Sequence, residues 1–328
     1  MQKSFFGRTG LEISEIALGG GVTGGILINA DETTRATALR RAIAGGVNWI
    51  DTASIYGKGA SEETIGRHIN DLSPRPNIST KVRLEPEDMN DIPRAIVRSL
   101  EGSLKRLQVP KIELFQLHNH IGTTLGGRAA VAIEQVLGRG GIADIFDQIK
   151  AHRLIQASGI TVAGDTKACL QVINSGRFDA AQVYYNAINP SAAWTRVPPE
   201  WKGQDFSGVI AACFRQNMGV LNIRVLAGGA LATPRRPDGL FMMTTGTDLD
   251  NEMRCGNAIR QALGEQYGTP SQAALRFVLG NRDIHSRIIG ISDLKQIDEA
   301  LEAVRHGPLP TAAISKLDQL WAHDFRMG

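Results

Sequence analysis

The chain has 328 residues, of which 42% are hydrophobic, and its 36 Lys and Arg nearly balance its 33 Asp and Glu, leaving a net charge of +3. This composition is typical of a globular protein. It argues against nucleic acid or an acidic membrane as the main partner, because those surfaces select a concentrated excess of Lys and Arg. We find no stretch near the roughly 20 apolar residues needed to cross a bilayer, and we expect no signal peptide because MQKSFFGRTGLEIS lacks an apolar core of sufficient length.

The cysteines are Cys169, Cys213 and Cys255. Their odd number and wide spacing predict neither a disulfide framework nor a zinc knuckle. We therefore expect no metal and a reducing, cytoplasmic location.

Short β-rich runs alternate with helical stretches along the chain. The candidate strands are Ile16–Gly20, Val47–Asp51, Ile78–Val82, Ile112–His118, Ala157–Ile160, Ala180–Tyr184, Val220–Leu226 and Arg287–Ile291. Apolar residues at helical spacing lie between them, most continuously from Ile92 to Leu107, and a last helix is expected from Ala312 to Phe325.

Alternation of strands and helices predicts parallel strands, because each helix returns the chain before the next strand begins. Eight such units indicate an α/β protein with a closed (β/α)8 barrel, while an open doubly wound sheet is the alternative. No linker divides residues 1–328, so we expect a single domain. Two long connections, Asn189–Phe206 and Thr233–Asn251, interrupt the pattern, and loops of this length are usually functional or mobile.

Four polar residues follow three consecutive candidate strands. Asp51 ends the second strand and Tyr56 follows it, Lys81 lies at the end of the third strand, and His118 ends the fourth. In a barrel these ends meet at one rim, where catalytic groups collect. An ammonium group beside a phenol favours the phenolate, and a carboxylate would hold that ammonium in place. Such a proton donor suits the addition of hydride to a carbonyl, and because no side chain supplies hydride, a nicotinamide cofactor is implied.

Each of these residues also has a purely structural interpretation. Asp51 could cap a helix, Tyr56 could be a packing residue, Lys81 could form a simple ion pair, and His118 could be a core histidine. Their joint placement at one rim favours a single site.

Several segments resemble the aldo-keto reductase superfamily in the correct order, over nearly the whole chain. They are GRTGLEISEIALGGG, VNWIDTASIYGKGASEETIG, ISTK, LKRLQVPKIELFQLH, IQASGI, QVYYN, VLAGGAL and IIGISDLKQIDEAL. The resemblance implies a barrel with a short N-terminal hairpin at its floor and an extra C-terminal helix. It also implies that Tyr56 is the general acid or base, that Lys81 lowers its pKa, that Asp51 supports Lys81, and that His118 positions the carbonyl of a small carbonyl or alcohol substrate. We expect Asn119 and His120 to shape the substrate pocket.

The resemblance further implies where a nicotinamide dinucleotide binds, with NADP slightly favoured over NAD. The expected cofactor-binding residues are Gly20, Thr161, Gln182, Leu226, Ala227, Gly228, Gly229, Ile291, Ser292 and Gln296. Thr161-Val162 replaces the family's Ser-Asn, and Ile223 replaces an aromatic that stacks on the nicotinamide ring. Basic residues that select NADP are missing near Gly290 and Gln296, so Lys295 or Arg287 would have to compensate.

The sequence allows three other interpretations. Gly19, Gly21 and Gly24 spell the GxGxxG of a Rossmann dehydrogenase, but the next helix is expected only near Asp31, too far on to cover a pyrophosphate. His118 and His120 could belong to a metal-dependent barrel hydrolase.

The third interpretation is a non-catalytic, cofactor-sensing subunit like those of potassium channels. Within the preferred interpretation, we expect Trp194, Trp201 and Phe241 to line the substrate pocket. The substrate, the direction of reaction and the choice between a monomer and a small homo-oligomer stay open.

Overall fold

Eight parallel strands close into a barrel in the computed structural model, which describes residues 1–122, 130–235 and 241–325. The barrel strands are β3 (Ile16–Gly19), β4 (Trp49–Asp51), β5 (Asn77–Val82), β6 (Ile112–Leu117), β9 (Ile155–Val162), β10 (Ala180–Tyr184), β11 (Gly219–Ile223) and β12 (Ser286–Gly290). They pair in chain order, and β12 pairs with β3 to close the ring. The predicted (β/α)8 barrel is confirmed, and the open sheet is excluded.

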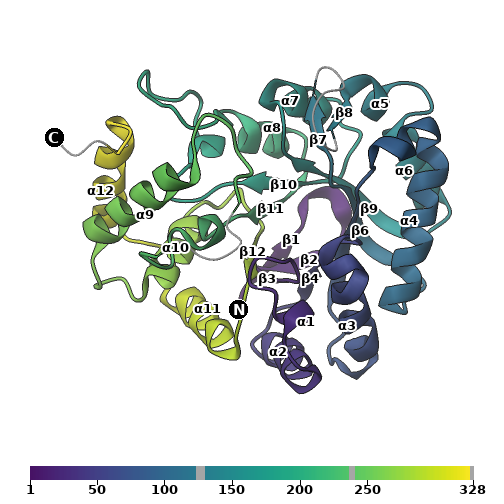
Figure 1. The fold of residues 1–328 in the computed structure, drawn as a ribbon, viewed down its shortest axis with the longest axis horizontal. Coiled ribbons are helices and arrows are strands. Elements are labelled where there is room, and N and C mark those ends of the chain that lie inside the picture. The colour runs from purple at the N-terminus through teal and green to yellow at the C-terminus, as the bar shows by residue number, and fades with distance from the viewer. Residues whose placement is uncertain (123–129, 236–240, 326–328) are drawn as a thin grey trace.

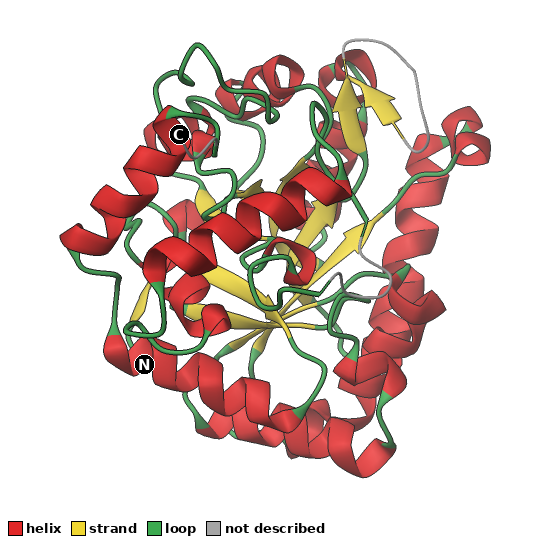
Figure 2. Cartoon of the chain, turned by 60° about the vertical axis from the view of Figure 1, so that its left-hand side comes forward, coloured by secondary structure: helices red, strands yellow, loops and turns green. Residues whose placement is uncertain are grey.

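The helices surround the strands, as Figures 1 and 2 show. They are α1 (Ile26–Asn29), α2 (Glu32–Ala44), α3 (Ala60–His68), α4 (Ile92–Leu107), α5 (Ile133–Leu137), α6 (Ile142–Ala151), α7 (Thr166–Asn174), α8 (Val209–Arg215), α9 (Leu249–Leu263), α10 (Pro270–Leu279), α11 (Leu294–His306) and α12 (Thr311–Ala322). The predicted stripe on α4 is buried at Ala95, Ile96, Leu100 and Leu107. Within the described ranges no helix is both long and apolar enough to span a membrane.

Strand ends differ from the predicted ones where the backbone turns. β11 ends at Ile223 and not at Leu226, because Arg224 adopts a left-handed φ of 60° that leaves the extended conformation. The chain then enters the short helix η6 (Ala227–Gly229). The residues predicted to meet the pyrophosphate therefore form a turn at the rim, beyond the strand.

The N-terminal hairpin closes one end of the barrel. Its strands β1 (Lys3–Phe5) and β2 (Glu12–Ser14) are antiparallel, and the residue after β1, Phe6, is fully buried against Trp49 with ring centroids 5.2 Å apart. An apolar cluster fills this end of the barrel; it comprises Phe6, Ile13, Ala17, Trp49, Leu114, Ala157, Ala180 and Leu221. Polar chemistry inside the barrel is therefore confined to the opposite, C-terminal end of the strands.

This arrangement predicts that Phe6→Ala lowers the free energy of unfolding by about 3–5 kcal/mol, since it opens a cavity under Trp49 that cannot readily collapse. Urea denaturation measures the change. The neighbouring Phe5→Ala is the matched control, because Phe5 is 70% exposed, and it should change stability by less than about 0.5 kcal/mol. Equal effects of the two variants would contradict the role of Phe6 as the floor of the barrel.

Candidate active site

A buried lysine forms the centre of the polar end of the barrel. Lys81 Nζ donates to Asp51 Oδ2 at 2.6 Å and to the Thr52 carbonyl at 2.7 Å, and it lies 3.4 Å from the Tyr56 hydroxyl. The register of β4 and β5 pairs Asp51 with Ser79, so Lys81, two residues on, points to the same interior face. Three of the four predicted residues are thus brought into direct contact.

The carboxylate of Asp51 is held from both sides. Its Oδ1 accepts from Ser79 Oγ and from Gln182 Nε2, each at 2.7 Å, while Ser79 Oγ accepts from Trp49 Nε1 at 2.9 Å. These bonds fix the orientation of the group that holds Lys81. Ser79 was not among the predicted site residues, although the period-two alternation of β5 places it on the face of Lys81.

Tyr56 and His118 face each other across the rim. Tyr56 begins the short helix η2 (Tyr56–Gly59), and its ring meets the His118 imidazole edge-on, with centroids 5.7 Å apart at 82°. A Cβ on Gly21 would lie 3.4 Å from Cε2 of the Tyr56 ring, so the loop after β3 packs closely against Tyr56. The fourth predicted residue therefore also belongs to the same site.

Burial and the neighbouring charges shift the pKa values of Tyr56 and Lys81. Burial raises the pKa of Tyr56 above its ordinary value; the Lys81 ammonium opposes this rise and the Asp51 carboxylate adds to it. Lys81 thus lowers the pKa of Tyr56 as expected, but burial raises this pKa by more than Lys81 lowers it. Burial lowers the pKa of Lys81, yet Asp51 and Tyr56 together hold it above the usual value.

Burial, reinforced by Lys81 and Arg83, lowers the pKa of His118 well below its ordinary value. His118 is therefore a neutral imidazole at neutral pH. A neutral imidazole can donate from one ring nitrogen and accept at the other.

Buried polar atoms without partners lie on β6 and β9 and on His118, which directly follows β6. They are both amide atoms of Gln116, Nδ1 of His118 and Oγ1 of Thr161. Buried polar groups almost always find a partner in the protein, in water or in a ligand. A ligand with both donors and acceptors fits them, and the carboxamide of nicotinamide is such a group. Thr161 was predicted as a cofactor residue; Gln116 was missed, although it lies two residues before His118 on the same strand.

Two other predicted cofactor residues have protein partners. Gln182 donates its amide to Asp51, and the Gly20 N–H donates to the Asp51 carbonyl at 2.8 Å. A Cβ on Gly20 would lie 2.4 Å from Ser61 Oγ, so a larger residue here would have to displace the Ser61 side chain. Contacts of both residues with a cofactor remain predictions.

The turn after β11 is a tight turn closed by its own backbone hydrogen bonds. Leu226 precedes Ala227, Gly228 and Gly229, which have positive φ angles of 48°, 67° and 109°. The Ala227 N–H donates to the Arg224 carbonyl and the Gly229 N–H to the Leu226 carbonyl, each at 2.8 Å. Contact of this turn with a pyrophosphate stays a prediction.

The loop after β12 leads into α11. Ser292 and Gln296 bond each other, with the Ser292 N–H donating to Gln296 Oε1 at 2.8 Å and Gln296 Nε2 to Ser292 Oγ at 3.0 Å. Asp293 caps the helix by accepting from the Gln296 N–H at 3.1 Å. The carbonyl of Ile291 accepts from the Ile26 N–H at 3.1 Å. The residue that caps α11, in the loop where a 2′-phosphate was expected, is therefore acidic.

Arg287 and Lys295, the two basic residues suggested as partners of a 2′-phosphate, differ in their surroundings. Arg287 is 4% exposed and donates to the carbonyls of Val278 and Asn281, so the expectation that it could meet a 2′-phosphate is wrong. The side chain of Lys295 is 84% exposed and lies 3.8 Å from Glu299. Lys295 is therefore the cation near this loop that stays available to solvent.

The residues expected around the substrate have different surroundings. Asn119 is fully buried, and its amide accepts from the Leu84 N–H at 2.9 Å and donates to the Leu84 carbonyl at 2.7 Å. It holds the loop that follows β5. Its direct contact with substrate stays a prediction.

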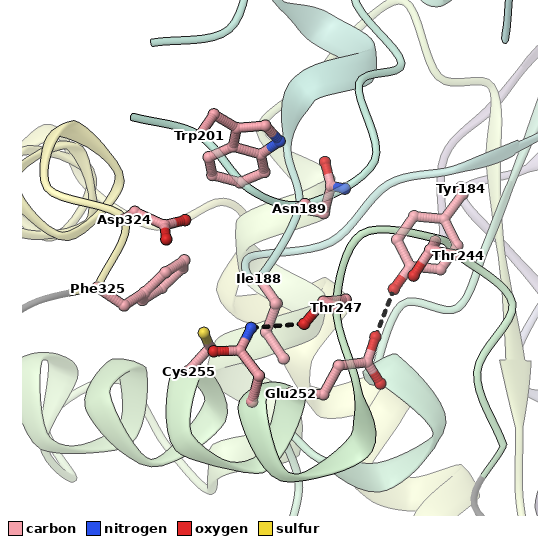
Figure 3. A pocket seen from close by; sticks show the side chains of 12 residues that line it. Tyr184, Ile188, Asn189, Trp201, Thr244, Thr247, Glu252, Cys255, Asp324 and Phe325 are labelled. Carbon is pink, nitrogen blue, oxygen red and sulfur yellow. Dashed lines mark hydrogen bonds between the residues drawn. The ribbon is translucent and has the colours of Figure 1, made fainter. Parts of the chain in front are cut away.

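Trp201 lines a pocket apart from the tetrad, shown in Figure 3. In this pocket the Tyr184 hydroxyl bonds Glu252 at 3.0 Å. Trp194 packs edge-on between Trp201 and Trp321, with centroids 5.2 and 5.8 Å away. Phe241, 46% exposed, contacts the Arg224 guanidinium. No tetrad residue lines the pocket of Figure 3, so its walls do not test the expected substrate pocket.

The structure speaks against the two alternative enzyme classes. The described residues contain no group of three or more His, Cys, Asp and Glu placed to hold a metal ion. His120 lies on the separate short strand β7 (His120–Gly122), which pairs with β8 (Ala130–Ala132). The glycines of GxGxxG lead into the four-residue helix α1, which the prediction missed, and the longer α2 begins only at Glu32.

The chain belongs to the aldo/keto reductase family, whose family model matches residues 15–322. This confirms the predicted resemblance. The family uses NADP(H), which agrees with the predicted class of cofactor.

Individual relatives span different shares of the chain. An uncharacterized oxidoreductase, YrpG, of Bacillus subtilis is 37% identical over 134 residues, which are 36% of this chain and only 40% of the relative. A putative voltage-gated potassium channel subunit beta of Schizosaccharomyces pombe is 26% identical over 96% of this chain and 92% of its own length.

Solved structures share the fold. The holo form of aldo-keto reductase AKR11C1 from Bacillus halodurans superposes with a TM-score of 0.73 at 20% identity, covering 98% of this chain and 97% of that one. An aldo/keto reductase from Klebsiella pneumoniae in complex with NADP and acetate gives 0.68 at 20% identity, covering 100% and 98%.

The neutral state of His118 predicts an acid sensitivity of the fold. The unfolded state takes up a proton below the ordinary histidine pKa of about 6.5, while the folded state resists it, so stability falls as the pH drops below that value. Between pH 7.5 and 5.5 the loss from this residue should be about 1 kcal/mol. Urea denaturation at both pH values should show a smaller loss for His118→Gln. The exposed His306→Gln is the control, and an unchanged loss in His118→Gln would contradict the assignment.

Proposed function

We propose that this protein is a nicotinamide-dependent oxidoreductase that interconverts a small aldehyde or ketone and the corresponding alcohol. The observation that carries the proposal is the position of Lys81 Nζ, 2.6 Å from Asp51 Oδ2 and 3.4 Å from the Tyr56 hydroxyl. That arrangement places a stabilising positive charge beside a phenol at the rim of the barrel, where a carbonyl oxygen could be protonated.

A bound nicotinamide coenzyme would supply the hydride for reduction of the carbonyl and accept it in oxidation of the alcohol. As negative charge develops on the substrate oxygen during reduction, the Tyr56 hydroxyl donates its proton. Lys81 stabilises the resulting phenolate, and Asp51 keeps Lys81 charged and in place. Neutral His118 bonds the substrate oxygen and orients it toward Tyr56. In the reverse direction the phenolate removes the alcohol proton.

The protonation states favour the reductive direction near neutral pH. Because burial raises the pKa of Tyr56, the phenol carries its proton at neutral pH. Oxidation requires the phenolate and therefore a higher pH. The substrate class that the proposal names is a small carbonyl compound. Arg83 is a cation close enough to act on His118, and it does not by itself identify the substrate.

Replacement of the proton donor tests this function. Tyr56→Phe should lower turnover of a reactive aldehyde about 100-fold or more, as expected for loss of a general acid, while NADPH still binds. Stopped-flow oxidation of NADPH and a fluorescence titration measure the two quantities. Tyr267→Phe, outside the tetrad, is the matched control. Near-normal turnover in Tyr56→Phe would rule out the assigned role, and NADPH binding without turnover of any aldehyde or ketone in a broad panel would rule out the enzyme.

We propose NADP(H) as the coenzyme, supported by the family and by the NADP-bound relative from Klebsiella pneumoniae. The acidic cap Asp293 and the neutral Gln296 make the preference over NAD(H) modest. Gln296→Arg should strengthen NADPH binding about tenfold with little effect on NADH, because a guanidinium at this position can pair with the 2′-phosphate. Calorimetric titration measures both affinities. Gln171→Arg on α7 adds the same charge elsewhere, and equal gains in both variants would contradict a local phosphate contact.

A further inference from the structure

Arg83 extends the interior face of β5 beyond the catalytic lysine. Its two neighbours, Val82 and Leu84, are buried in the same apolar cluster as Ile96 of α4. Successive side chains of an extended chain point to opposite faces, so Arg83 points to the interior side, as Lys81 does two residues before it. Arg83 therefore lies at the rim of the barrel, directly beyond the tetrad.

The segment after β6 runs alongside Arg83. The His118 N–H donates to the Val82 carbonyl at 2.8 Å, which continues the pairing of β5 with β6 past the ends of both strands. Asn119 then forms two hydrogen bonds with the backbone of Leu84, at 2.9 and 2.7 Å. Arg83 and His118 are thus side by side on the same face, at roughly the 4.8 Å spacing of paired strands.

The charges at the rim show that Arg83 is close to two histidines. Burial lowers the pKa of His118 most, and Lys81 and Arg83 lower it further. Burial and then Arg83 also lower the pKa of His120. The Lys81 ammonium is paired with Asp51 at 2.6 Å, and His118 is neutral. Arg83 therefore adds a positive charge to the rim, next to the residue that is proposed to orient the substrate carbonyl.

The guanidinium of Arg83 is only partly engaged. Its contact among the described residues is an ion pair with Glu85, in which Nε lies 3.2 Å from Oε1. Nε is buried and forms no hydrogen bond within that part of the chain. The Glu85 side chain is 47% exposed, so water competes for it. A guanidinium has five N–H donors, and this ion pair leaves donors available for a ligand.

Other arginines with buried partners serve the fold, and Arg83 differs from them. Arg106 Nε donates at 2.7 Å to the fully buried Glu62, which ties α4 to α3. Arg287 donates to backbone carbonyls. Exposed ion pairs such as that of Arg83 with Glu85 contribute little to stability. Stability alone therefore does not account for a guanidinium on the interior face of the rim.

We infer that Arg83 binds an anionic group of the substrate, a carboxylate or a phosphate, and that the substrate is therefore a small acidic carbonyl compound. This inference rests on the proposed function, since it narrows the substrate class of the same site. The planar fork of a guanidinium matches two oxygens of either group. Because paired strands lie about 4.8 Å apart, the anionic group and the carbonyl oxygen held by His118 must be only a few bonds apart.

The experiment compares substrates that differ in charge alone. Steady-state reduction with NADPH is measured for 4-oxobutanoate against its neutral methyl ester, and for glyceraldehyde 3-phosphate against glyceraldehyde. Wild type should show a kcat/KM about tenfold or more higher for the charged member of at least one pair, the effect of one charge-assisted hydrogen bond. The pair that shows the preference identifies the anionic group as carboxylate or phosphate.

Two variants should move this preference in opposite directions. Arg83→Gln should raise KM for the preferred anion about 30-fold, with kcat and the neutral substrate little changed, because binding is lost and proton transfer is not. Glu85→Gln removes the competing carboxylate and should lower KM for the same anion about two- to threefold. Arg40→Gln, which removes an exposed charge on α2, is the matched control and should keep the wild-type values.

Equal kcat/KM of wild type for the charged and neutral members of both pairs would overturn the inference. An equal loss with charged and neutral substrates in Arg83→Gln would also overturn it, since that result assigns Arg83 to the fold or to the tetrad. If Arg83→Gln cannot be purified, an unchanged or raised KM for the anion in Glu85→Gln is decisive against it. Absence of turnover with these four compounds and with a broad panel of aldehydes would instead refute the proposed function.

Discussion

The buried ion pair between Lys81 and Asp51 is the interaction on which the polar end of this barrel depends. Both groups are removed from water, and such charges are tolerated only when each is paired and further hydrogen-bonded. Asp51 meets this condition through Lys81, Ser79 and Gln182, and Lys81 through Asp51 and the Thr52 carbonyl. Loss of one partner would strand the other charge, which in buried pairs costs about 3–5 kcal/mol. The same bonds that satisfy the charges also fix their position beside Tyr56.

The barrel interior is divided along its axis, and this division makes the ion pair possible. Phe6 and Trp49 close the floor with apolar surface, and the buried ion pair lies toward the C-terminal ends of the strands. The indole of Trp49 links the two halves, because its ring packs in the floor while its Nε1 donates to Ser79 in the polar layer. Stability is concentrated at one end of the strands and chemistry at the other.

The low polarity of the barrel interior shifts the pKa of each buried titratable group toward its uncharged form. Burial favours the neutral forms of Tyr56 and His118, while Lys81 stays charged because Asp51 supplies a compensating carboxylate. One environment thus produces a protonated phenol, a neutral imidazole and an ammonium side by side. These are the forms that reduction of a carbonyl requires at neutral pH. Gln116 and Thr161 extend the same principle, since their unpartnered atoms lie where the interior still lacks polar partners.

Local pattern was sufficient to predict the strands, the barrel and the four tetrad residues. Periodicity of two and of 3.6 residues reports which side chains are buried, and parallel strands must present their C-terminal ends together, so Asp51, Lys81 and His118 were expected at one rim. Chain order alone could not reveal how the barrel brings distant residues into contact. Gln182 reaches Asp51 across 131 residues of sequence, and Arg287, a plausible phosphate ligand by its position, is turned outward to cap backbone carbonyls of α10 and the turn after it. Hydrogen bonds and burial depend on which strands become neighbours when the barrel closes, and that is settled by packing over the whole chain.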